Sequence, residues 1–99
     1  MSAKVSRAHQ RKRILWEAKL HQDGCIWHCA ALDISPRGAK IQIDQPLGID
    51  SKVVLAINRL GRFQGEVRWQ NDSIAGILFL EDAGIVEERL RGMPRTKEM

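Results

Sequence analysis

The fold is decided by residues 14–34, which read ILWEAKLHQDGCIWHCAALDI. In the first part of this stretch, apolar residues fall at every second position, which is the spacing of a strand with one buried face. Those apolar residues are Ile14, Trp16, Ala18 and Leu20. Asp23 and Gly24 follow, and both residue types tolerate positive φ, as a tight hairpin turn requires. A second strand over residues 25–34 completes the pattern of an antiparallel hairpin.

The same pattern continues to residue 80 in short runs separated by turn residues such as Ser35-Pro36-Arg37-Gly38. Further strands are expected over residues 39–43, 53–57, 63–70 and 74–80. In the fifth strand, the alternation places one set of side chains in the core: Phe63, Gly65, Val67 and Trp69. The other set should face outward: Gln64, Glu66, Arg68 and Gln70. Six short strands favour a closed antiparallel barrel, because closure removes exposed strand edges.

In the C-terminal part of the sequence, the spacing of apolar residues changes from that of a strand to that of a helix. Val86, Leu90 and Met93 are four and three residues apart, which is the spacing of one face of a helix. We expect this helix over residues 82–93, with Asp82 as its N-terminal cap. The sequence therefore predicts an all-β domain over residues 1–99, divided into a basic arm (1–13), a six-stranded barrel (14–80) and the short helix.

The positive charge is concentrated at the N-terminus. The 99 residues carry 16 Lys and Arg against 12 Asp and Glu, for a net charge of +4. Five of the bases precede the first acid, Glu17: Lys4, Arg7, Arg11, Lys12 and Arg13. The remainder is almost neutral, so the excess belongs to an arm that we expect to be flexible and either solvated or matched to an anionic partner. With no apolar run of about 20 residues and no leader segment, we expect a cytoplasmic protein that does not insert into membranes.

The sequence offers little for catalysis or metal binding. It contains neither a nucleophile elbow nor a phosphate-binding glycine loop, and its carboxylates are scattered singly, so we expect no enzyme. Four residues of zinc-ligand type lie close in sequence: His21, Cys25, His28 and Cys29. On one strand, however, Cys25 and Cys29 would lie about 13 Å apart, with His28 on the opposite face. We therefore expect no metal site, but two buried thiols beside Trp27 and an exposed His28.

Two polar motifs stand in the order of a known ligand-binding signature. Arg7 and Arg11 are separated by three residues, and Asp33, Ser35 and Gly38 follow after one strand and one hairpin. This Arg-x-x-x-Arg and Asp-x-Ser-x-x-Gly pair resembles the signature of the PilZ domain. The resemblance extends to about Glu81 through further matching positions: Gly48, Gly61, Val67-Arg68-Trp69, Gly76 and Phe79.

The resemblance implies a six-stranded barrel that binds cyclic di-GMP and signals to an effector protein in motility, polysaccharide or virulence control. In that case Arg7 and Arg11 clasp the ligand, since an arginine fork matches the O6 and N7 acceptors of guanine and the oxygens of phosphate. Asp33 accepts from guanine N–H groups or orients an arginine, and Ser35 donates to the ligand. Gly38 would allow a positive φ that brings the backbone close to the ligand. No cofactor other than this ligand is implied.

Each site residue also has a simpler interpretation. Asp33 and Ser35 are common turn residues that bond to the local backbone. Arg13 and Arg37 are candidates for further ligand contacts, or exposed flanks of their strands. The alternation places Trp69 in the core, and the alternative is that its ring reaches the ligand and stacks there.

Two other functions remain open from sequence alone. One is a small barrel that binds single-stranded nucleic acid through its basic arm. The near-neutral body and the inward-facing tryptophans disfavour it, because such binders need exposed stacking platforms. The other is a PilZ-like module that has lost its ligand and contacts only proteins, which the complete motif disfavours.

Overall fold

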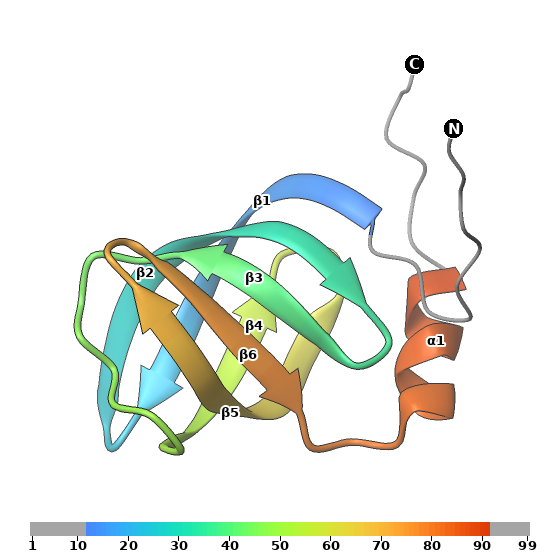
Figure 1. Ribbon diagram of the computed structural model, residues 1–99. Helices are drawn as coiled ribbons and strands as arrows, with labels where there is room; N and C mark the ends of the chain where they lie inside the picture. The colour runs from blue at the N-terminus through green and yellow to red at the C-terminus, as the bar shows by residue number, and fades with distance from the viewer. Residues whose placement is uncertain (1–11, 92–99) are drawn as a thin grey trace, which may run out of the picture.

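A closed antiparallel barrel forms the body of the protein. The computed structural model describes residues 12–91, and Figure 1 shows their strands wrapped around a common interior with the helix beside the barrel. The elements are β1 (Lys12–Gln22), β2 (Cys25–Ser35), β3 (Gly38–Gln42), β4 (Lys52–Ile57), β5 (Gly61–Asn71), β6 (Ile74–Phe79) and α1 (Ala83–Arg91). Around the barrel the strands follow the order β1-β2-β3-β6-β5-β4. The predicted six-stranded barrel with a short C-terminal helix is confirmed.

The β1–β2 hairpin turns as its sequence predicts. Asp23 has φ 51° and Gly24 has φ 83°, so both residues occupy the left-handed region that a two-residue hairpin needs. From this turn the two strands pair continuously from Gln22 opposite Cys25 up to Trp16 opposite Ala31. The turn therefore sets the register of the β1–β2 pair as far as Trp16 and Ala31.

The barrel interior is filled by aliphatic side chains around two phenylalanines. The rings of Phe63 and Phe79 stack with their centroids 4.8 Å apart. The fully buried side chains of largest volume are Phe63, Leu20, Ile34, Ile41, Ile43, Leu55, Val67 and Val86. Burial of this apolar surface is the main source of stability in a domain of this size.

Helix α1 is attached to the barrel by two apolar residues and one arginine. Val86 and Leu90 are buried, whereas Met93 lies outside the described residues. The Arg89 guanidinium lies 4.8 Å from the centroid of the Phe63 ring and donates to the Arg62 carbonyl oxygen at 2.8 Å. Asp82 precedes the helix, and its carbonyl oxygen accepts from the Val86 N–H group at 3.1 Å.

A β-bulge in β5 overturns the expected position of Trp69. Pairing with β6 runs from Val67 opposite Ile77 to Trp69 opposite Gly76, so Arg68 is an extra residue in β5. An extra residue moves the following side chains to the other face of the sheet. Trp69 is consequently 44% exposed on the outside of the barrel, and its expected core position is wrong.

Gln70, beyond the same bulge, is half-buried instead of facing outward as expected. Its side-chain amide donates to the Gln45 carbonyl oxygen at 2.7 Å, and its side-chain oxygen accepts from the Leu47 N–H group at 2.9 Å. Through these two hydrogen bonds, Gln70 of β5 holds the loop that connects β3 and β4.

The cysteines are less buried than expected. Cys25 is exposed, Cys29 is half-buried, and both are free thiols. The reason is that β2 pairs with β3 only from Ala30 onward, so residues 25–29 have β1 as their one paired neighbour among residues 12–91. His28 is exposed, as predicted. Within the described range, no helix is long and apolar enough to cross a membrane.

Candidate ligand-binding site

A second bulge brings the polar motif of β2 to the outer face of the barrel. Pairing with β3 passes from Ala31 opposite Ile41 to Asp33 opposite Lys40, which leaves Leu32 as the extra residue. Strict alternation from the buried Ala31 would have placed Asp33 in the core. Because of the bulge, Asp33 stands on the same face as Lys40, and the apolar Ile34 points inward.

Asp33 is held close to the barrel surface. It is 8% exposed, and its Oδ2 lies 3.6 Å from Nζ of Lys40, whose side chain is 43% exposed. The ion pair holds the carboxylate beside the Lys40 ammonium group on the outer face of the barrel. Asp33 is therefore a fixed acceptor at the edge of a cationic surface.

The Ser35 hydroxyl shapes the turn that follows. Its oxygen accepts from the Arg37 N–H group at 3.3 Å, and the hydroxyl lies 3.5 Å from the Gly38 carbonyl oxygen. Ser35 is 4% exposed, which fits the simpler interpretation of this residue as part of the turn. Pro36 and Arg37 form the two-residue turn itself, and Arg37 is exposed at its tip.

Gly38 is required for space and not for a special backbone angle. Among the residues of 12–91, positive φ occurs at three other glycines, so the expectation of positive φ at Gly38 is wrong. A Cβ atom on Gly38 would lie 2.2 Å from the carbonyl oxygen of Ile77 in β6. The motif glycine thus allows β3 and β6 to approach each other closely just beyond the turn.

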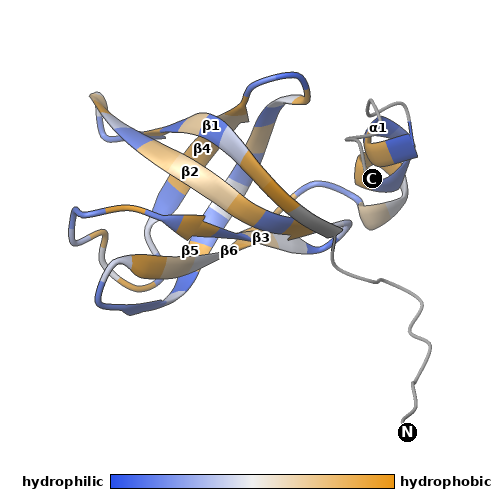
Figure 2. Cartoon of the chain, turned by 90° about the horizontal axis from the view of Figure 1, so that it is seen from above, coloured by the Kyte–Doolittle hydropathy of each residue, from blue (hydrophilic) through white to orange (hydrophobic). Residues whose placement is uncertain are grey.

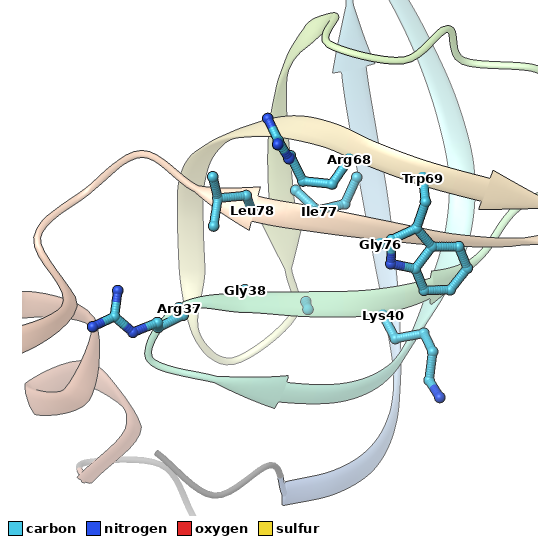
Figure 3. A pocket seen from close by; sticks show the side chains of 9 residues that line it. Arg37, Gly38, Lys40, Arg68, Trp69, Gly76, Ile77 and Leu78 are labelled. Carbon is cyan, nitrogen blue, oxygen red and sulfur yellow. The ribbon is translucent and has the colours of Figure 1, made fainter. Parts of the chain in front are cut away.

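A pocket of about 250 Å³ lies on the outer face of β3, β6 and β5 (Figure 3). Gly38 and Gly76 leave its floor without side chains, while Lys40 and Trp69 stand at one end. Arg37 lies at the turn, on the side of the pocket that faces α1. The pocket therefore adjoins the Asp33–Lys40 pair directly, because Lys40 belongs to both.

The indole of Trp69 lies flat across Gly76. A Cβ atom on Gly76 would be 2.2 Å from Nε1 of Trp69 and 2.5 Å from its Cε2. A glycine within a strand often marks such a close approach. The ring is thereby fixed against the strand with its other face open to a planar ligand.

We expect Gly76→Ala to displace this indole without unfolding the barrel. The obstacle is an exposed side chain that can rotate away, so the free energy of unfolding should fall by no more than about 1 kcal/mol. Acrylamide quenching of tryptophan fluorescence should increase, and the Trp69→Phe variant identifies the signal of this ring. Unchanged quenching would contradict the close packing of Trp69 on Gly76.

The pocket is basic. Arg37, Lys40 and Arg68 line it, and no carboxylate is among its lining residues. Arg68 forms ion pairs with Glu66 at 3.4 Å and with Asp50 at 3.6 Å, whereas Arg37 makes no ion pair within residues 12–91. The arrangement of an open aromatic face, a flat floor and bases fits a planar ligand that carries negative charge.

The arginine motif itself lies outside the described residues, as do the side chains of Lys12 and Arg13. The backbone of β1 nevertheless fixes where that motif joins the barrel. The first residue of β1, Lys12, pairs with Ile34, and Arg13 pairs with Asp33. Arg11 directly precedes Lys12 in the sequence, so the described chain begins at the end of the β1–β2 pair that holds Asp33.

The pocket residues to which the sequence assigns no ligand-binding role include Lys40, Arg68 and Gly76. Lys40 is identified only by its register opposite Asp33. Arg68 is exposed as alternation predicts, whereas the outward position of Trp69 depends on the bulge in β5, which strict alternation does not reveal. Gly76 carries a usable signal, because a glycine between apolar strand residues suggests close approach of another group.

The four residues of zinc-ligand type in β1 and β2 are His21, Cys25, His28 and Cys29. Among residues 12–91, no group of three or more His, Cys, Asp or Glu side chains is arranged to hold a metal ion. Burial raises the pKa of the Cys29 thiol to about 11, so this group is protonated at neutral pH and is a poor ligand or nucleophile.

Comparison with known proteins agrees with this geometry. No individual curated protein matches the sequence. The PilZ domain family matches residues 6–93, which include both halves of the motif and every strand of the barrel. The chain therefore belongs to the PilZ domain family.

Proposed function

We propose that this protein binds cyclic di-GMP between the arm that carries Arg7 and Arg11 and the outer face of β3, β6 and β5. PilZ domains form a family of receptors for this nucleotide, and they are binding and adaptor domains, not typical enzymes. One observation carries the proposal for this chain. The strand that follows Arg11 pairs with the end of β2 that holds Asp33 and Ser35, beside a basic pocket with an open indole.

The two arginines supply the strongest expected contacts. Each guanidinium can donate two parallel hydrogen bonds to the O6 and N7 atoms of a guanine, or to phosphate oxygens. Arg13 and Arg37 extend this set of bases on either side of the motif. A ligand with two phosphates and two guanines offers partners for all of them.

The pocket supplies the surface against which the ligand rests. We propose that one guanine stacks on the exposed face of Trp69, beside the part of the floor at Gly38 that carries no side chain. Stacking of a base on an aromatic side chain contributes about 1–3 kcal/mol. Lys40 and Arg68 then lie at the edges of that base, where their positive charges can attract the phosphates of the ligand.

Asp33 has a role that charge alone does not predict. As a carboxylate it accepts hydrogen bonds, so it can bind guanine N–H groups or hold an arginine of the arm in position. Ser35 keeps the turn in its shape through the Arg37 N–H group, and it adds a hydroxyl close to the ligand. We propose that ligand binding orders the arm and that the new surface is recognised by an effector protein in the cytoplasm.

Replacing Asp33 tests this proposal by the sign of its effect. Asp33→Ala should weaken cyclic di-GMP binding about tenfold, because a hydrogen-bond acceptor for the ligand or the arm is lost. A nonspecific phosphate clamp predicts the opposite, since a negative charge is removed from beside an anion. Isothermal titration calorimetry measures the effect.

Asp44→Ala is the matched control, because it removes an exposed carboxylate away from the pocket. Its binding should equal that of the wild type. Tighter or unchanged binding by Asp33→Ala would contradict a specific site at the β2–β3 turn.

A further inference from the structure

A groove crosses the outer face of β1 and β4 and extends onto β2 and the start of β5, apart from the residues that line the ligand pocket. It consists of two hollows of about 400 Å³ and about 360 Å³ that share His21 and Ile26 in their walls. In Figure 2, β1, β2 and β4 lie on one side of the barrel, and β3, β5 and β6 lie on the other. We call these two hollows together the outer groove.

The smaller hollow is lined by bases without a matching acid. Lys19 pairs with Ala56, and Ala56 pairs with Arg62 on the next strand, so the three residues form one row across β1, β4 and β5. Neighbouring strands are about 4.8 Å apart, so two long cationic side chains flank a single small residue. His21 stands beside them, and no carboxylate lines this hollow.

These charges are not neutralised within the described part of the protein. Neither Lys19 nor Arg62 forms an ion pair with any residue of 12–91. Two of the three bases of the ligand pocket differ, because Lys40 pairs with Asp33 and Arg68 pairs with Glu66. Two unpaired cations over a small residue leave room for an oxyanion between them.

The larger hollow is mainly apolar. Ile26 is 55% exposed, Leu80 is 47% exposed, and the half-buried Val54 of β4 also lines this hollow. The charges in this hollow, Asp23 and Lys52, have opposite sign. Exposed apolar side chains beside a charged rim are typical of protein contact sites.

We propose that the outer groove binds an acidic segment of a partner protein. An apolar side chain of that segment occupies the larger hollow, and a neighbouring carboxylate lies between Lys19 and Arg62. A peptide fits better than a nucleic acid or a membrane surface, because no Phe, Trp or Tyr side chain lines either hollow for base stacking or interfacial anchoring. The inference rests on the proposed function only in taking the protein to be an adaptor.

The test uses the full chain and a fluorescein-labelled peptide of alternating Glu and Leu. Fluorescence polarisation should give saturable binding that weakens as salt is added. The double variant Lys19→Gln/Arg62→Gln should lose about tenfold in affinity. Its matched control, Arg59→Gln/Arg91→Gln, removes the same charge from outside the groove and should bind as the wild type does.

Two further probes identify the occupant. Single-stranded DNA and vesicles containing phosphatidylserine should show no difference between the two double variants. The inference is overturned if both variants lose peptide affinity equally, or if the groove variant loses affinity for DNA or vesicles instead.

Cyclic di-GMP titration separates this inference from the proposed function. The groove variant should bind the nucleotide as the wild type does, because neither Lys19 nor Arg62 lines the ligand pocket. If the peptide binds the outer groove but the nucleotide does not bind, the proposed function is contradicted, whereas the inference that the outer groove binds an acidic peptide is supported.

Discussion

Gly38→Ala is expected to lower the free energy of unfolding by about 2 kcal/mol or more. The added methyl group would lie 2.2 Å from the Ile77 carbonyl oxygen, which belongs to the backbone of the adjacent strand. Unlike the indole over Gly76, this oxygen cannot rotate away. The β3–β6 pair must separate where Gly38 faces Leu78, so the hydrogen bonds on both sides of it weaken.

Thermal unfolding measures this effect, with an expected fall in Tm of about 10 °C. Gly84→Ala is the matched control, because it adds the same methyl group in helix α1, where the nearest atom is the exposed Asp82 carboxylate at 3.1 Å. Alanine favours helix formation, so the control should be neutral or slightly stabilising. Equal Tm values for the two variants would contradict the close approach of β3 and β6 at Gly38.

Arg11→Ala is expected to weaken cyclic di-GMP binding by about 1.5–3 kcal/mol, which is roughly ten- to a hundredfold. The proposed site assigns to Arg11 charge-assisted hydrogen bonds that no neighbouring residue replaces. Arg11→Lys should recover only part of the loss, because an ammonium group cannot reproduce the planar fork of arginine. Calorimetric titration measures both variants.

Lys4→Ala is the control for Arg11, since it removes one positive charge from the same N-terminal segment outside the motif. It should reduce binding about twofold at most. Amide hydrogen exchange should also slow on ligand addition at residues 1–12 in the wild type and not in Arg11→Ala. If Arg11→Lys or Lys4→Ala matches the effect of Arg11→Ala, the arm acts by total charge and not through a specific arginine contact.

The strands were predictable because each depends on a local pattern. Alternation along residues 14–20, the Asp23-Gly24 turn and the helical spacing of Val86 and Leu90 all correspond to observed elements. These signals require only the neighbouring residues of the chain. The number of strands and the barrel class therefore followed from the sequence.

The bulges were not predictable, and they determine the site. One extra residue at Leu32 turns Asp33 outward, and one at Arg68 turns Trp69 outward. Whether an extra residue is accommodated depends on the partner strand, which single-strand alternation does not contain. Lys40 joins the site for the same reason, because only the strand register brings it to Asp33.

The exposure of Trp69 also removes one argument against the alternative function, which is binding of single-stranded nucleic acid. An inward-facing tryptophan argued against base stacking, whereas an indole that is 44% exposed offers a stacking surface to any base. A specific pocket and a nonspecific clamp therefore differ in which nucleotides they accept. Selectivity between cyclic di-GMP and other nucleotides therefore distinguishes a cyclic di-GMP receptor from a nonspecific nucleic-acid binder.

Calorimetric titration of the full chain with cyclic di-GMP, GMP and single-stranded DNA tests the central claim most directly. A receptor with a defined pocket should give saturable heat with cyclic di-GMP and at least about tenfold weaker binding of the other two. Such a difference corresponds to about 1.4 kcal/mol of binding free energy. No heat with cyclic di-GMP, or equal affinity for single-stranded DNA, would contradict the account.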